Sequence, residues 1–273
     1  MCLKPESRLS LITSLSNPKI KEAVKLREGK HQRRIGKFVI DGIRELDRAL
    51  QAGIRILDVF TDRPLPIPFS AAYPNLNVHQ VTDRVMEKIV FGDRDEGILA
   101  VAEKPVRSFE IFETVIGQKE CPLLAVLENV EKPGNLGAIF RSADAAGIDG
   151  VMIADSIVDP FHSSAIRSSL GTVFSMPIVS GSSAVICAWL KDRQFQIAAA
   201  WCDEHAVPYT AYDFCRPTAM VLGREAGGLT QLWGSEGITA VTLPMRGIAD
   251  SLNVSVAAGI LFYEARRQRE LSK

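Results

Sequence analysis

The apolar and polar positions of the 273 residues follow a pattern that predicts strands and helices in alternation along the whole chain. Short apolar runs that predict strands include KFVID at 37–41, GILAVAE at 97–103 and LLAVLEN at 123–129. Between such runs lie segments with helical spacing, for example GIRELDRALQAG at 42–53. This alternation favours an α/β fold with largely parallel sheets.

The pattern is interrupted once, near residue 104. Before it, a basic helix at 17–36 opens a compact set of strands and helices. Residues 105–120 have weak periodicity and mixed charge, which indicates a linker or an irregular bridging element. The alternation then restarts and ends in an apolar helix at 253–271. We therefore expect a smaller N-terminal domain at 1–104, a linker at 105–120 and a larger domain at 121–273.

Composition places the chain among ordinary globular proteins. Hydrophobic residues make up 47% and charged residues 23% of it, and no apolar run approaches the roughly 20 residues of a membrane helix. The first residues, MCLKPESRLS, contain no apolar stretch typical of a secretory leader. The five cysteines and four histidines show no metal-ligand spacing. We expect a cytoplasmic protein with no membrane segment and no metal.

Charge is balanced overall but not locally. The chain has 32 basic and 32 acidic residues, yet the stretch 17–48 has ten Lys or Arg against five Asp or Glu. A solvated helix face explains such an excess, and so does a surface that binds phosphate. The sequence leaves both explanations open at this point.

A glycine-rich turn, TAMVLGREAGGLT at 218–230, has part of the spacing of a phosphate-binding P-loop. Gly223 and Gly228 are five residues apart and Thr230 follows, but Leu229 occupies the place of the essential lysine. Glu225 adds a negative charge inside the turn. These features argue against an NTPase, and the absence of any G-x-G motif argues against a dinucleotide-binding dehydrogenase.

Two other polar loops also follow predicted strands, where open α/β sheets place ligands. In PGNLGAIFRSADAAG, Asn135 stands where it would cap a helix, and Arg141 lies about 600° further around that helix. In LPMRGIADSLNVSVAAG, Ser251 and Asn253 lie between a strand and the last helix. Capping alone accounts for each of these residues taken singly.

Taken together, in this order and spacing, the three loops resemble the signature motifs of the SpoU family of RNA ribose 2′-O-methyltransferases, also called the TrmH family, within the SPOUT superfamily. The matching segments are PGNLGAIFRSADAAG at 133–147, VLGREAGGLT at 221–230 and LPMRGIADSLNVSVAAGILFYEA at 243–265. The resemblance covers roughly residues 122–270. Residues 37–62 are more loosely similar to the ribosomal-protein-like RNA-binding domain common in this family.

The resemblance implies a C-terminal SPOUT domain with a deep trefoil knot around a largely parallel sheet, a smaller N-terminal α/β RNA-binding domain, and S-adenosyl-L-methionine as cofactor. It implies three groups of site residues. Those that would line the cofactor pocket are Leu222, Gly223, Leu243, Met245, Leu252 and Asn253. Those that would serve catalysis are Asn135, Arg141, Glu225, Ser251 and Asn253. Those that would contact RNA or its phosphates are Arg167 and Ser169, together with Lys30, Arg33 and Arg34 of the basic stretch.

By this resemblance Arg141 activates the ribose hydroxyl, either as a general base or by stabilising the developing alkoxide. The family works as homodimers with the site built between subunits, which agrees with the wide apolar face of the last helix. The N-terminal domain favours large-subunit rRNA as substrate over tRNA. A knotted module that binds RNA or a ligand without catalysis is the remaining alternative.

Overall fold

The computed structural model describes residues 11–90, 96–201, 205–224 and 227–272. The chain divides into two compact units, which we describe separately. The first comprises Met1–Pro105 together with Phe161–Arg167, and the second comprises Val106–Pro160 and Ser168–Lys273. The grouping of Phe161–Arg167 with the first unit differs from the sequence expectation, which placed all of 121–273 in one domain.

The first unit is built on a four-stranded mixed sheet in the order β1-β4-β2-β3. Its strands are β1 (Lys37–Asp41), β2 (Ile56–Thr61), β3 (Val78–Gln80) and β4 (Ile98–Glu103). The middle strand β4 runs antiparallel to both neighbours, and only β2 and β3 pair in parallel. The expectation of largely parallel sheets is therefore wrong for this unit, because β4 inserts between β1 and β2 in the opposite direction.

Helices pack on this sheet with their apolar residues inward. They are α1 (Pro18–Lys25), α2 (Gly29–Ile35), α3 (Ile43–Gln51), α4 (Ile67–Ala72) and α5 (Asp83–Ile89). Ile20 and Leu26 are buried with Phe60 and Leu99 of the sheet. The single basic helix expected at 17–36 is two helices, α1 and α2, separated by a turn after Lys25.

The segment Phe161–Arg167, which belongs to the first unit although it is distant in sequence, includes most of α8 (Ser163–Ser168). The ring of Phe161 packs on that of Phe38, with 4.9 Å between centroids. The Nη2 atom of Arg167 donates to Oδ2 of Asp41 at 2.7 Å, and Asp41 is buried. An aromatic contact and an ion pair thus contribute to the attachment of this segment to β1.

The second unit contains a parallel sheet of seven strands in the order β7-β6-β5-β10-β8-β11-β9. The strands are β5 (Leu123–Glu128), β6 (Gly150–Ala154), β7 (Ile178–Gly181), β8 (Gln196–Ala200), β9 (Val207–Pro208), β10 (Thr218–Leu222) and β11 (Ile238–Thr242). Here the predicted parallel sheet is confirmed. From β5 the chain adds β6 and then β7 on one side. The later strands lie on the other side, with β10 between β5 and β8, so the direction in which strands are added reverses between β5 and β10. Whether the chain forms the expected knot stays a prediction.

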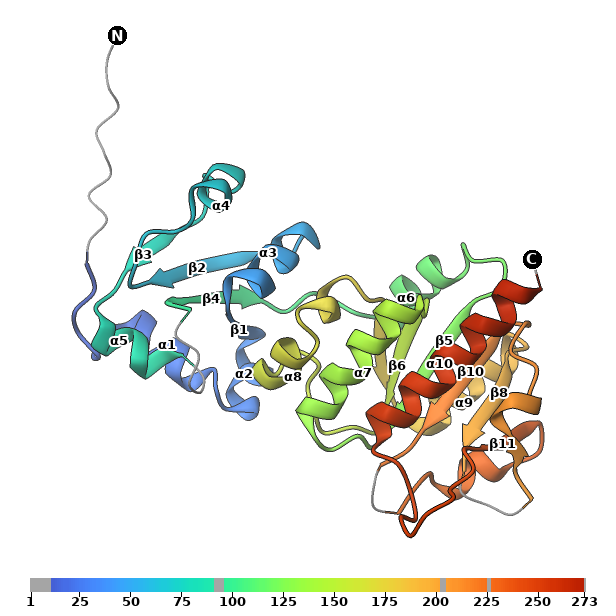
Figure 1. Ribbon diagram of the computed structural model, residues 1–273. Helices are drawn as coiled ribbons and strands as arrows, with labels where there is room; N and C mark the ends of the chain where they lie inside the picture. The colour runs from blue at the N-terminus through green and yellow to red at the C-terminus, as the bar shows by residue number, and fades with distance from the viewer. Residues whose placement is uncertain (1–10, 91–95, 202–204, 225–226, 273) are drawn as a thin grey trace. The chain divides into compact units, whose positions relative to one another are not determined.

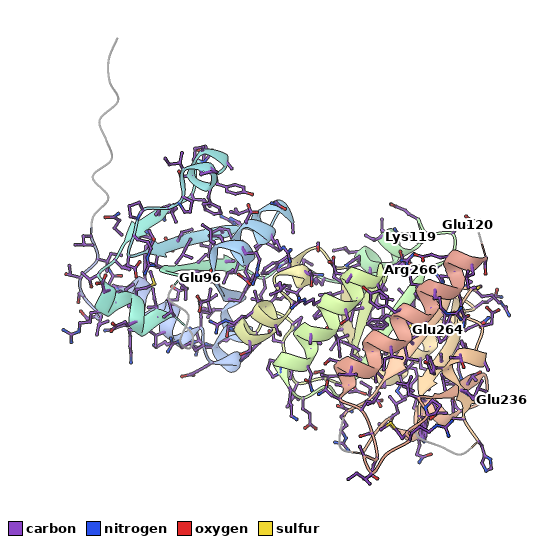
Figure 2. All side chains as sticks on the ribbon, viewed as in Figure 1. Glu96, Lys119, Glu120, Glu236, Glu264 and Arg266 are labelled. Carbon is purple, nitrogen blue, oxygen red and sulfur yellow. The ribbon has the colours of Figure 1, made fainter. Side chains whose placement is uncertain are left out.

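Helices cover both faces of this sheet (Figure 1). On one face α7 (Pro133–Ala146) and the long α10 (Val254–Leu271) lie side by side, and Arg266 of α10 donates to the backbone carbonyls of Ala146 and Gly147 at the end of α7 (Figure 2). On the other, α6 (Phe109–Ile116) and α9 (Ser183–Asp192) share a core with the sheet. Short 3₁₀ helices complete the unit: η1 (Thr172–Phe174), η2 (Tyr209–Ala211) and η3 (Gln231–Gly234).

Helix α6 occupies the segment in which the sequence indicated a linker or an irregular element. The side chain of Ser108 caps it by accepting a hydrogen bond from the Ile111 amide. Phe112 and Ile116, four residues apart on one face, are buried in the core of the second unit. With only eight residues, the helix is too short for its periodicity to stand out from the sequence.

Candidate active site

A cavity of about 330 Å³ opens at the carboxyl ends of β8, β10 and β11 in the second unit. Its walls are the end of β10, the glycine-rich turn after it, the loop after β11, and the first turn of α10. The strand order reverses beside β10, which is where open α/β sheets bind ligands. The cavity volume is in the range typical of small-molecule sites.

Five of the six residues predicted to bind the cofactor line this cavity: Leu222, Gly223, Leu243, Met245 and Leu252. Leu222 is buried, whereas Leu243, Met245 and Leu252 are half-buried and present apolar surface to the cavity. Asn253 is not among the lining residues. It is the cap of α10, where its Oδ1 accepts hydrogen bonds from the amide and hydroxyl of Ser255.

The glycine-rich turn folds back on itself. A side chain at Gly223 would place its Cβ 2.8 Å from the carbonyl carbon of Gly228 and 2.8 Å from the amide nitrogen of Leu229, so only glycine fits. Gly227 and Gly228 have φ angles of +94° and +62°, which ordinary residues rarely adopt. Because these glycines carry no side chains, the backbone of the turn faces the cavity directly.

Glu128, the last residue of β5, was not among the predicted site residues. Its side chain has no exposed surface, and its carboxyl oxygens accept hydrogen bonds from Ser183, Thr230 and Trp233. A signal was present, because an acid ends an otherwise apolar strand, LLAVLE. Its partners lie 55 to 105 residues away in sequence, which hides them from any local pattern.

Of the predicted catalytic residues, Asn135 and Arg141 lie in α7, and Ser251 and Asn253 lie directly before α10. Nδ2 of Asn253 donates to Oδ1 of Asn135 at 3.3 Å, which joins the start of α10 to the start of α7. Ser251 is exposed and lines the cavity. Glu225 lies outside the described residues.

Arg141, the residue predicted to activate the ribose hydroxyl, lies on α7 with its side chain exposed. It does not line the cavity of its own chain, and it makes no hydrogen bond or ion pair to the part of the chain that the structure describes. Two other arginines are near the cavity walls. Arg224 lines the cavity and forms an ion pair with Glu131 at 3.7 Å. Arg246 is exposed and follows Met245 in the sequence.

The predicted RNA contacts have varied surroundings. Arg167 is paired with Asp41 and 28% of its side chain is exposed. Ser169 is fully buried, and its hydroxyl oxygen accepts a hydrogen bond from the Gly171 amide. Arg34 is within 3.0 Å of the His31 ring nitrogen, and the side chains of Lys30 and Arg33 lie outside the described residues.

The described residues contain no group of three or more His, Cys, Asp or Glu side chains placed to hold a metal ion. Over the same ranges, no helix has the length and apolarity that a membrane span needs.

Comparison with known proteins identifies the family. The profile described as the SpoU rRNA methylase family matches residues 122–263, which are more than half of the chain. The chain belongs to the SpoU rRNA methylase family. A second profile, described as an MRM3-like substrate binding domain, matches residues 17–100. The family resemblance read from the three loops is thus confirmed.

Proteins named as RNA methyltransferases resemble this chain along most of its length. It is 31% identical to the 23S rRNA (uridine(2479)-2′-O)-methyltransferase of Streptomyces viridochromogenes, covering 86% of this chain and 84% of that protein. A crystal structure of an RNA 2′-O ribose methyltransferase matches with a TM-score of 0.80, 38% identity and coverage of 96% and 100%. The AdoMet-bound rRNA methyltransferase of Sinorhizobium meliloti matches with a TM-score of 0.84, 28% identity and coverage of 94% and 97%.

Proposed function

We propose that this SpoU-family protein transfers a methyl group from S-adenosyl-L-methionine to a ribose 2′-hydroxyl of RNA. The observation that carries the proposal is the cavity at the carboxyl ends of the parallel strands, where the residues picked out by the second and third motifs meet. Relatives of the chain along most of its length are named as 2′-O-methyltransferases.

The cavity fits the cofactor in chemistry and in size. Leu222, Leu243 and Leu252 offer apolar contacts to an adenine ring, and the turn at Gly227 and Gly228 offers backbone amides and carbonyls without side chains in the way. When bound, S-adenosylmethionine supplies a methyl group on a positively charged sulfur. The residues of the chain orient this group and prepare the hydroxyl that attacks it.

Arg141 is our candidate for that preparation. Its guanidinium has no partner among the described residues, so its donors are available to a ribose oxygen or an adjacent phosphate. A guanidinium is almost always charged, which suits stabilisation of a developing alkoxide, whereas a role as general base requires a neutral form. Asn135 and Asn253 hold the starts of α7 and α10 together and thereby fix the helix that carries Arg141.

We propose that a second copy of the chain completes the site. Arg141 does not line the cavity of its own chain, and a second copy with its own Arg141 at that cavity would bring the guanidinium to the cofactor. Helix α10 offers an apolar surface for such an association, because Val256 and Tyr263 are 49% and 55% exposed. Sedimentation or light scattering of the full chain tests this proposal, and a monomer that is fully active would contradict it.

Ribosomal RNA is the proposed substrate, and cytoplasm the proposed location. The relatives in Streptomyces and Sinorhizobium are named as acting on rRNA, and residues 17–100 match a substrate binding domain. The excess of positive charge at 17–48 gives this region attraction for a phosphate backbone. Transfer RNA remains the second candidate.

The test is transfer of labelled methyl groups from S-adenosylmethionine to unmodified rRNA and tRNA, followed by alkaline hydrolysis. A 2′-O-methyl group blocks cleavage at its nucleotide, so label in an alkali-resistant dinucleotide from rRNA is the expected result. Label that is released with ordinary mononucleotides would contradict ribose methylation. Label in dinucleotides from tRNA alone would replace the proposed substrate but keep the reaction.

A further inference from the structure

Glu128 is a buried acid whose side chain accepts hydrogen bonds from four donors, two of them on Thr230 next to the cavity wall. Its Oε1 accepts from the Ser183 hydroxyl at 2.6 Å, the Thr230 hydroxyl at 2.8 Å and Nε1 of Trp233 at 2.8 Å, while its Oε2 accepts from the Thr230 amide at 2.8 Å. Burying a carboxyl group without partners is strongly unfavourable. Four donors offset this cost and fix the surrounding chain in return.

Three of these four donors come from the chain directly after the glycine-rich turn. Thr230 follows Leu229, which lines the cavity, and Trp233 lies in η3. The other end of the turn is held by sheet pairing, where Leu222 of β10 is in register with Leu127 of β5. Both ends of the turn are therefore attached to consecutive residues of β5, Leu127 through the backbone and Glu128 through its side chain.

We propose that Glu128 is a positioning residue for the cofactor site. It does not line the cavity. It acts through Thr230, whose amide it anchors, and so holds Gly227, Gly228 and Leu229 at the distance from Gly223 that gives the cavity its shape. This inference rests on the proposed function, because it assigns the cavity to S-adenosylmethionine.

A purely structural role is the competing explanation, and the two differ in what they predict. A carboxyl group that only ties η3 to β5 lowers the stability of the fold when it is changed, and it leaves the affinity for S-adenosylmethionine as it was. A positioning residue changes the affinity itself, because the folded protein then presents a displaced turn to the cofactor.

The first variant is Glu128→Gln in the full-length chain, with the dissociation constant for S-adenosylmethionine measured by calorimetry. Gln keeps the size of Glu but puts an NH₂ group among donors, and neither the Thr230 amide nor Trp233 Nε1 can accept from it. We expect binding about tenfold weaker. In steady state the KM for S-adenosylmethionine rises, and kcat at saturating cofactor stays within a few fold.

Glu264→Gln is the matched control. Glu264 is also buried in the second unit, on α10, and accepts hydrogen bonds from Arg267 and Gln268 (Figure 2). It does not line the cavity. We expect this variant to melt at a lower temperature than the wild type while binding S-adenosylmethionine with unchanged affinity.

Two milder variants decide the question if Glu128→Gln does not fold. Trp233→Phe removes only the Nε1 donor, and Thr230→Val removes only the hydroxyl and keeps the amide. We expect each to weaken binding about threefold. Wild-type affinity in every folded variant of the three, with a lowered melting temperature, would overturn the inference. Failure of the wild-type protein to bind S-adenosylmethionine would instead overturn the proposed function.

Discussion

The two ends of the seven-stranded sheet use arginine in opposite ways. At the amino end, Arg269 of α10 donates to the backbone carbonyls of Cys121, Pro122, Phe214 and Arg216. Arg141, on the helix that follows β5 at the carboxyl end, has no partner among the described residues and is exposed. The first arginine satisfies groups of its own fold, and the second keeps its five donors available for something outside the chain.

We expect the largest effect, a loss of methyl transfer, from Arg141→Ala. If Arg141 stabilises charge in the transition state, its loss lowers kcat for methyl transfer about 10²- to 10³-fold. The melting temperature should stay near that of the wild type, because the removed side chain has no partner in the described part of the protein. Methyl transfer to rRNA and thermal unfolding measure the two effects. Methyl transfer by Arg141→Ala at the wild-type rate would show that Arg141 has no catalytic role.

Gly223→Ala should have the next largest effect, and it acts on the cavity itself. The added Cβ would meet backbone atoms of Gly228 and Leu229, which cannot move aside as a flexible side chain can. We expect binding of S-adenosylmethionine to weaken by more than about tenfold, since displacing the turn alters the cavity wall. Gly259→Ala on α10 is the matched control. Its Cβ would make one ordinary contact, 3.9 Å from Ser142 Oγ, and should leave the affinity unchanged.

Arg269→Ala tests the role of the arginine at the amino end of the sheet. It removes a donor from four backbone carbonyls, of which those of Pro122 and Arg216 keep hydrogen bonds from Thr218, and we expect the free energy of unfolding to fall by about 2 to 3 kcal/mol. Denaturant unfolding measures this, and calorimetry should show unchanged affinity for S-adenosylmethionine. Arg267→Ala is the control, because 55% of the Arg267 side chain is exposed and its partner, the Glu264 carboxylate, keeps a hydrogen bond from Gln268, so we expect a smaller loss of about 1 kcal/mol. Equal losses in both variants would contradict the role we assign to Arg269.

The smallest effect concerns Tyr212, near the same end of the sheet. Burial, with a further contribution from Asp213, raises the pKa of its hydroxyl from near 10 to about 12. Between these pH values the unfolded chain loses the tyrosine proton while the folded chain keeps it, so the free energy of unfolding falls as pH rises. We expect about 2 kcal/mol of this loss to be absent in Tyr212→Phe. If the free energy of unfolding falls equally in the wild type and in Tyr212→Phe between pH 10 and 12, Tyr212 is not the source of the loss.

Features formed by residues that are close together in the sequence could be predicted from the sequence alone. The apolar runs of β5, β6, β8, β10 and β11 are long enough to identify as strands, and the three loops match a family whose motifs are themselves local. Five predicted cofactor residues meet at one cavity because they end or follow parallel strands or lie just before α10. The catalytic and RNA-binding roles of the predicted residues stay predictions.

Contacts that depend on the order of the strands in the sheet could not be predicted from the sequence. The contact of Glu128 with Thr230 exists because β10 inserts next to β5, and a pairing across 102 residues leaves no local trace. The same holds for Arg167 and Asp41, which are 126 residues apart. Sequence therefore indicated Arg167 as a phosphate contact, although in the fold it already has a carboxylate partner.

The attachment of Phe161–Arg167 to the first unit has a consequence for how this protein can recombine with its relatives. A single crossover near Pro105 exchanges β1 but leaves the segment at 161–167 behind. Asp41 and Phe38 would then be inherited from one parent, and Arg167 and Phe161 from the other. Chimeras between family members should therefore tolerate an exchanged N-terminal region only when both parents supply compatible residues at these four positions, or when the segment is exchanged along with it.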